Sequence, residues 1–115
     1  MERMRYAALA VLALWAGTAS AEQRLGVDVY RRAEFLASRT ALVKQSAGVE
    51  AACYRTADKP DAVQSYYLKS QGFARQEGNV LRRGQVDVVL HPPAANPRTG
   101  VVSRYTVFCI MQAVD

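Results

Sequence analysis

The stretch from Glu50 to Phe73 constrains the fold most, because it carries the signals for a strand, a helix and a helix stop in close succession. Apolar and polar residues alternate over 50–56, which is typical of a strand with two different faces. Cys53 lies on one face of this expected strand and Tyr54 lies on the other. The alternation therefore predicts a strand that belongs to a sheet covered on at least one side.

A helix is expected directly after this strand. The Asp58 carboxylate is placed to cap the first turn, and Pro60 is tolerated there because first-turn amides have no helical partner. Gly72 predicts a left-handed C-cap, after which Phe73 can pack back on the last turn. The helical face expected to meet the sheet carries Val63, Tyr66 and Tyr67.

Before this unit, the spacing predicts an extended lead-in or edge strand over 22–30 and an amphipathic helix over 33–46 that ends at Gly48. After it, Gly78-Asn79 predicts a hairpin within residues 73–83. Val86–Leu90 is rich in β-branched residues and predicts a central strand.

The segment Pro92–Gly100 predicts an exposed loop, because its three prolines lack the amide donors that a strand ladder needs. Val101–Val114 then predicts the longest strand, and both of its faces are apolar in the middle. One face should meet the helices, and the other should meet a partner, a second layer or a lipid-like ligand. Together these elements predict a single small α+β domain over residues 22–115: an antiparallel sheet of about four strands with one or two helices on one face.

The first 21 residues have the pattern of a secretory signal peptide. Arg3 and Arg5 precede an apolar run, and Ala19-Ser20-Ala21 provides the small residues of a cleavage site. The run is shorter than the roughly 20 residues of a membrane span, so we expect cleavage after Ala21, no transmembrane span in the mature chain, and a periplasmic or secreted location. An uncleaved anchor is the alternative.

The chain has two cysteines, Cys53 and Cys109. In an exported chain an even number of cysteines favours a disulfide, which requires the two residues to lie on adjacent strands or across a strand–helix contact. Two separate buried thiols are the alternative.

The residues expected of common catalytic and cofactor sites are missing. His91 is the one histidine, and it lacks the His or Cys companions of a metal site and an identifiable nucleophile. The chain has no C-x-x-C motif and no phosphate-binding glycine loop. We therefore expect no catalytic residue, no metal ligand and no cofactor.

Basic residues define a candidate interaction surface instead, and the formal net charge is +5. An exported chain meets little nucleic acid, so an envelope protein or an anionic envelope component is the better partner. The alternative is that these are ordinary solvated charges. The residues of this candidate surface are Arg82, Arg83, Arg98, Arg104 and Tyr105.

The chain resembles a family of small exported bacterial proteins of uncharacterised function. That family has a lead-in ending in Tyr-Pro-Gly-Ala, a strand with Tyr-x-Thr-x-Asp, and a helix with Val-x-x-Phe-Tyr and Lys-x-Gln. The similarity covers most of Leu25–Gln112, departs from the pattern at Arg31-Arg32, and implies a fold and a compartment but no catalytic residue. The matching residues are Tyr30, Tyr54-Arg55-Thr56, Asp58, Val63, Tyr66-Tyr67, Lys69 and Gln71.

Three functions follow as hypotheses. The first is a non-enzymatic module that binds another envelope component. The second is a small carrier that holds an apolar ligand between helix and sheet near Tyr66, Tyr67 and Phe108. The third, with the weakest support, is an enzyme that depends on His91.

Overall fold

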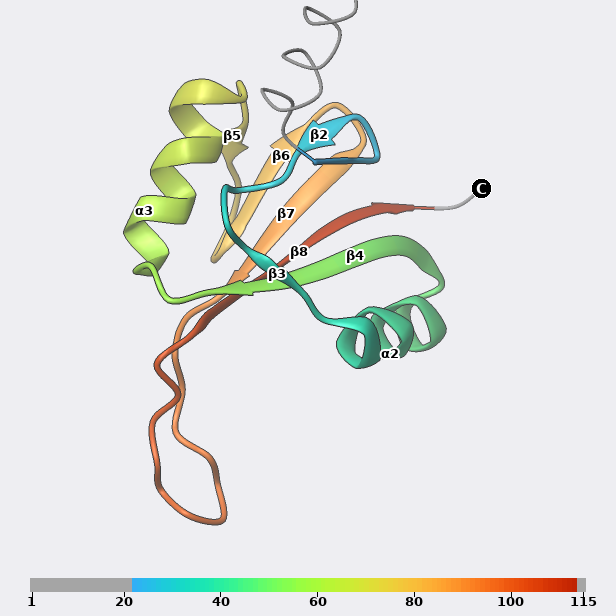
Figure 1. Cartoon of the computed structure of the whole chain (residues 1–115). Coiled ribbons are helices and arrows are strands. Elements are labelled where there is room, and N and C mark those ends of the chain that lie inside the picture. The colour runs from blue at the N-terminus through green and yellow to red at the C-terminus, as the bar shows by residue number, and fades with distance from the viewer. Residues whose placement is uncertain (1–21, 114–115) are drawn as a thin grey trace, which may run out of the picture.

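The computed structural model describes residues 22–113, so the predicted signal peptide lies outside the described part. The chain has an α+β fold with one six-stranded antiparallel sheet and one two-stranded sheet (Figure 1). Within the described residues, no helix is long and apolar enough to cross a membrane.

The six strands lie in the order β3-β4-β8-β7-β6-β5, and every neighbouring pair is antiparallel. This is more than the expected four strands or so, because two edge strands of two residues each extend the sheet. Their bounds are β3 Glu34–Phe35, β4 Val49–Thr56, β5 Ala74–Arg75, β6 Val80–Arg83, β7 Val86–His91 and β8 Thr106–Ala113.

The other elements cover this sheet. The expected lead-in strand is instead a small hairpin of β1 (Gln23–Arg24) and β2 (Val27–Asp28). The first helix is α2 (Ala37–Ala47), and the second is α3 (Pro60–Ser65), which continues as the π-helical turn η1 (Tyr66–Ser70).

The core lies between one face of the sheet and the layer formed by α3, η1 and the β1–β2 hairpin. Tyr54 of β4 stacks on Phe108 of β8 with ring centroids 5.6 Å apart, and Tyr67 of η1 packs on Phe108 at 6.0 Å. Val63 and Tyr67 are fully buried, as the helical pattern predicts. The expected strand face of Ala52, Tyr54 and Thr56 is therefore the core face.

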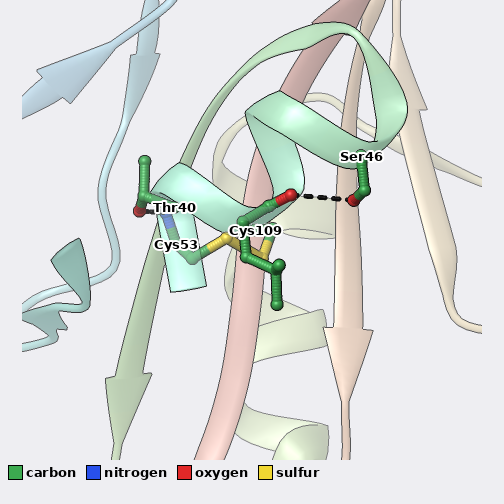
Figure 2. Close-up of a disulfide and its surroundings, with 5 residues drawn as sticks. Thr40, Ser46, Cys53 and Cys109 are labelled. Carbon is green, nitrogen blue, oxygen red and sulfur yellow. Dashed lines mark hydrogen bonds between the residues drawn. A yellow bond between two sulfur atoms is a disulfide. The ribbon is translucent and has the colours of Figure 1, made fainter. Parts of the chain in front are cut away.

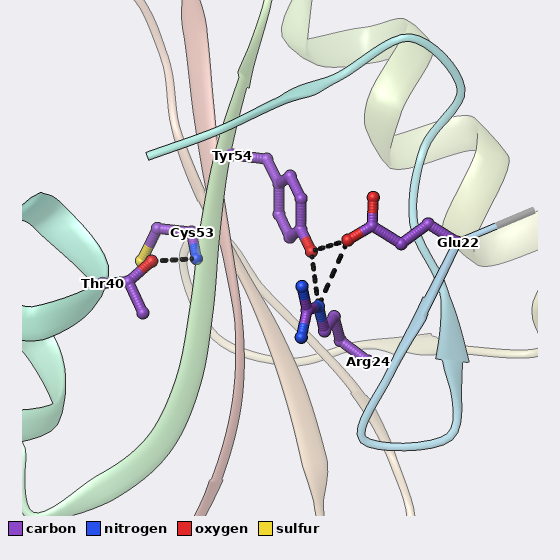
Figure 3. A network of polar contacts seen from close by, with 5 residues as sticks. All are labelled: Glu22, Arg24, Thr40, Cys53 and Tyr54. Atoms are coloured by element: carbon purple, nitrogen blue, oxygen red, sulfur yellow. Dashed lines mark hydrogen bonds and ion pairs between the residues drawn. The ribbon is translucent and has the colours of Figure 1, made fainter. Parts of the chain in front are cut away.

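Polar contacts fix the β1–β2 hairpin over this core. The Tyr54 hydroxyl donates to the Glu22 carboxylate (2.9 Å), and the Arg24 guanidinium donates to the Tyr54 oxygen (3.1 Å) (Figure 3). The Tyr67 hydroxyl donates to the Asp28 carbonyl (2.9 Å) and accepts from the Tyr30 amide (3.0 Å). Burial raises the pKa of both Tyr54 and Tyr67, so these phenols stay neutral.

The two helices lie on opposite faces of the sheet, which corrects the prediction that they share one face. Helix α2 lies over the face that carries the disulfide (Figure 2), whereas α3 and η1 cover the face of Tyr54 and Phe108. The apolar residues of α2 do not face the sheet as a stripe: Thr40 is its buried residue, and Leu42 is 63% exposed.

Cys53 and Cys109 form a disulfide between β4 and β8, with a sulfur–sulfur distance of 2.14 Å (Figure 2). The two residues are direct partners in the antiparallel ladder, so their Cα atoms are only 4.0 Å apart. Both are buried, and the Thr40 hydroxyl of α2 accepts a hydrogen bond from the Cys53 amide (2.8 Å). The adjacent-strand arrangement expected for a bridge is therefore present.

The beginnings of both helices differ from the predictions. Helix α2 begins at Ala37 rather than at residue 33, because Phe35 pairs with Tyr54 as part of β3. Asp58 does not cap α3; its carboxylate accepts a hydrogen bond from the Tyr30 hydroxyl (2.5 Å), and Lys59 precedes the helix instead.

The end of the second helix is as expected. Gly72 has a φ of 74°, and the amide of Phe73 donates to the carbonyl of Tyr67 (3.0 Å). The two rings then pack edge to face, 5.5 Å apart.

The last strand begins at Thr106 and not at residue 101. Its ladder partner β7 ends at His91, and the prolines that follow cannot donate to a ladder. Residues 92–105 therefore form an arm, which projects away from the sheet between β7 and β8 (Figure 1). All of its residues are exposed except the partly buried Tyr105.

Candidate α2–arm groove

A groove of about 440 Å³ lies between the beginning of α2, one end of the sheet and the base of the arm. We call it the α2–arm groove. It opens on the sheet face that carries the disulfide, because Arg55 and Val107 alternate with the core residues of β4 and β8. Its lining residues are Phe35, Leu36, Ala37, Ser38, Arg39, Arg55, Ser103, Tyr105 and Val107.

Two aromatic residues contribute to the lining in different ways. Phe35 lies at the edge of the groove, but its ring is on the Tyr54 side of the sheet: Phe35 is the ladder partner of Tyr54, the two rings are 5.5 Å apart, and the Arg24 guanidinium stands 5.6 Å from the Phe35 centroid. Tyr105 lies at the base of the arm, and the Arg55 guanidinium stands 4.2 Å from its ring centroid. Arg104 approaches the same ring at 5.8 Å. Tyr105 is thus held by two cations at the mouth of the groove.

The groove is positively charged. Arg39 and Arg55 line it, and Arg104 lies beside it. Among the ion pairs of the described residues, one involves these arginines: Arg55 donates to Glu34 at 2.8 Å, and this hydrogen bond raises the pKa of the guanidinium. Both partners are substantially exposed, so the pair is screened by water and leaves a net positive charge in the groove.

The beginning of α2 adds to this positive potential. Leu36 stands at the N-cap without a side-chain capping bond, and the first turn has no acidic residue. The first amides of a helix lack helical partners and carry a partial positive charge. With the arginines nearby, the groove suits an anionic group.

His91 lies at the end of β7, on the same sheet face as Val107, its ladder partner. Its side chain is exposed, yet the atoms packed around the ring and the charge of Arg39 lower its pKa. Within residues 22–113, no group of three or more His, Cys, Asp or Glu side chains is arranged to hold a metal ion.

The structure separates the five residues of the predicted interaction surface. Arg98, Arg104 and Tyr105 belong to the arm. Arg82 lies at the other end of the disulfide face and pairs with Asp87 (2.7 and 3.1 Å). They therefore do not form one continuous surface.

Arg83 points to the opposite face and has a structural role. Its guanidinium donates to the carbonyls of Gln71 (2.6 Å) and Gly26 (3.0 Å) and lies 4.9 Å from the Phe73 ring centroid. It ties β6 to the end of η1 and to the β1–β2 hairpin.

Sequence reasoning missed Phe35, Arg39 and Arg55 as groove residues. The amphipathic helix expected over residues 33–46 includes Phe35 in its apolar stripe. In the structure Phe35 lies in a two-residue strand instead, which depends on pairing with distant Tyr54. One signal was present: Arg39 interrupts that expected stripe, which indicates that this part of the helix does not face a core.

In comparisons with known proteins, no family model, no curated protein and no solved structure matches this chain.

Proposed function

We propose that this chain is an exported, non-enzymatic binding module that holds an anionic component of the cell envelope in the α2–arm groove. The observation that carries the proposal is that Arg39 and Arg55 line this groove and Arg104 lies beside it, against the ring of Tyr105. Arginine forms planar, paired hydrogen bonds with carboxylate or phosphate groups.

The alternative function, a carrier of an apolar ligand, has less support. It requires room between helix and sheet near Tyr66, Tyr67 and Phe108. Tyr67 and Phe108 are fully buried and pack on each other and on Tyr54, so aromatic rings fill this space. Tyr66 completes the same cluster against Tyr67 at 5.0 Å. The open groove on the other face therefore favours a binding module over a carrier.

Site-specific photo-crosslinking in cells tests the proposal. A photoreactive phenylalanine analogue at Ser38, an exposed residue of α2 in the groove lining, should give a discrete adduct with an envelope component. The same analogue at Leu42, an exposed residue on α2 outside the groove lining, is the matched control and should give none. Mass spectrometry of the adduct then identifies the anionic component.

The charge requirement is tested in the same cells. Arg39→Gln and Arg55→Gln should each reduce the Ser38 adduct, whereas Arg75→Gln, on edge strand β5 at the far side of the sheet, should leave it unchanged. Equal labelling at Ser38 and Leu42, or an adduct that survives the double substitution of Arg39 and Arg55, would contradict the proposal.

A further inference from the structure

The tip of the arm between β7 and β8 is ordered by hydrogen bonds. The Asn96 amide donates to the Val101 carbonyl (2.9 Å) and the Ser103 amide to the Ala94 carbonyl (3.1 Å), so the two sides of the arm pair as a short hairpin. An isolated bridge between Ala95 and Val102 continues this pairing. The arm is therefore ordered by its own hydrogen bonds, although it packs little on the domain.

Every backbone N–H group from Asn96 to Val101 forms a hydrogen bond within the arm. The side-chain oxygen of Asn96 accepts hydrogen bonds from the backbone amides of Arg98 (2.8 Å) and Thr99 (3.3 Å). The backbone carbonyl of Asn96 accepts one from the Gly100 amide (2.8 Å). The Thr99 hydroxyl accepts from Val101 (3.2 Å), and residue 97 is a proline with no amide hydrogen. Moving an unbonded amide out of water is costly, so the bonds made by these amides lower the cost of taking the tip out of water.

The side chains of the arm are apolar and basic. Val101 and Val102 are 67% and 63% exposed. Arg98 and Arg104 carry its positive charges, and the sequence has no Asp or Glu between Val88 and Val114. An anionic surface is therefore the complementary partner.

The two valines distinguish a bilayer surface from an ordinary protein surface. They are consecutive in an extended segment, so their side chains point to opposite sides. A flat protein surface would cover one of them and leave the other in water. The interfacial region of a bilayer surrounds an inserted tip and covers both, while arginines reach the phosphate groups above it.

We propose that the arm inserts its tip into the surface of an anionic phospholipid bilayer. Pro97 lies six positions after His91, and an extended segment of that length reaches about 20 Å. Shallow insertion needs roughly 5–10 Å, so the domain can stay outside the lipid while the tip is immersed. This deepens the proposed function by naming the surface on which the groove works; it shares Arg104 with the groove, but Arg98, Val101 and Val102 are not part of the groove.

Tryptophan fluorescence with lipid vesicles tests the insertion locally. The described residues contain no tryptophan, and the one in the sequence is Trp15. The exported protein with Val102→Trp, in a Trp15→Phe background, should shift its emission to the blue with vesicles of equal phosphatidylglycerol and phosphatidylcholine. Brominated lipid should quench it. Leu42→Trp, equally exposed but on α2, is the control and should not respond.

Further variants separate the apolar contribution to vesicle binding from the electrostatic one. Val101→Ser with Val102→Ser should lower the vesicle partition coefficient about tenfold, because two apolar side chains are lost. Arg98→Gln with Arg104→Gln should weaken binding in low salt and remove most of its salt dependence. Circular dichroism checks that each variant is folded.

The proposal is overturned if Val102→Trp fails to respond to the anionic vesicles, or responds no more than Leu42→Trp. A blue shift that arises only with an added acidic protein would assign the arm to a protein surface instead. Failure of the Ser38 crosslink with a positive vesicle result would reject the groove function alone. A specific Ser38 crosslink with a negative vesicle result would reject only the insertion.

Discussion

At the scale of single residues, neighbours in the sequence have unrelated roles. Arg82 and Arg83 are adjacent in β6, so they point to opposite faces of the sheet. Arg82 forms an exposed ion pair with Asp87, whereas Arg83 bonds two backbone carbonyls beneath the β1–β2 hairpin. A sequence shows the two positive charges but not which one is used inside the fold.

This difference predicts unequal costs of substitution. Arg83→Gln should lower the free energy of unfolding by about 1–3 kcal/mol, because it removes charge-assisted hydrogen bonds and a cation–ring contact. Arg82→Gln should change it by no more than about 0.5 kcal/mol, since exposed ion pairs contribute little. Urea titration of both variants measures this, and equal losses would contradict the assigned role of Arg83.

Tyr67 predicts how stability depends on high pH. Its phenol is buried and its folded pKa is raised by burial, whereas in the unfolded chain it ionises near pH 10. Above that pH the unfolded state loses a proton that the folded state keeps, so ionisation favours unfolding. Wild-type stability should therefore fall as the pH rises above about 10.

Tyr67→Phe isolates this contribution. At pH 7 the variant should be less stable by about 1–3 kcal/mol, because the Asp28 carbonyl and the Tyr30 amide lose a buried partner. Between pH 9 and 11 its stability should fall less than that of the wild type. Val63→Ala, which creates a cavity in the same cluster, is the control and should keep the wild-type slope. Parallel slopes for all three proteins would refute the role of Tyr67.

At the scale of elements, local patterns predicted those that carry their own signals. The strand at residues 50–56, the Gly72 stop, the hairpin after Phe73 and the β7 strand are all present. β5 is the first strand of that predicted hairpin, whereas β3 forms only through pairing with β4. No periodicity can be read in a strand of two residues, so β3 was not expected.

The disulfide joins the two longest strands, β4 and β8, near the middle of their ladder. It closes a sequence separation of 56 residues, so it restricts the unfolded chain substantially. Cys53→Ala with Cys109→Ala should lower the free energy of unfolding by about 2–5 kcal/mol.

Denaturant titrations with and without a reductant measure this effect. The reductant should shift the wild-type midpoint down to that of the double variant and leave the double variant unchanged. Alkylation of the denatured exported protein without a reductant is the direct check, and two modified thiols would contradict the bridge. The groove residues lie outside the bond itself, so the Ser38 adduct should persist in the double variant.

At the scale of the whole molecule, the sequence predicted the fold class and the core better than the candidate site. The core follows from alternation and helical spacing, which are local properties. The α2–arm groove depends on three things that no local pattern states: α2 lies opposite α3, the last strand begins only at Thr106, and Phe35 enters the sheet. All three follow from strand pairing over long sequence separations.

The structure of the arm predicts that its removal abolishes vesicle binding but leaves the stability of the domain nearly unchanged. It is exposed from His91 to Arg104, and its hydrogen bonds are internal, so the domain should fold without it. Replacing residues 93–104 with a short Asn-Gly turn would let β7 and β8 join as a tight hairpin, since their ladder already reaches His91 and Val107. The urea midpoint should change little.

Vesicle binding by the shortened protein should fall to the background level, because both valines and both arginines of the arm are removed. A matched variant keeps the arm but exchanges Pro97 for Ala, which retains the charges and the apolar residues; it should bind vesicles within about threefold of the wild type, since the changed side chain is small. If the shortened protein is folded and still binds vesicles like the wild type, the lipid contact lies elsewhere on the domain. If it unfolds at much lower urea concentrations, the arm contributes to the core, and the view of it as a separate binding element is wrong.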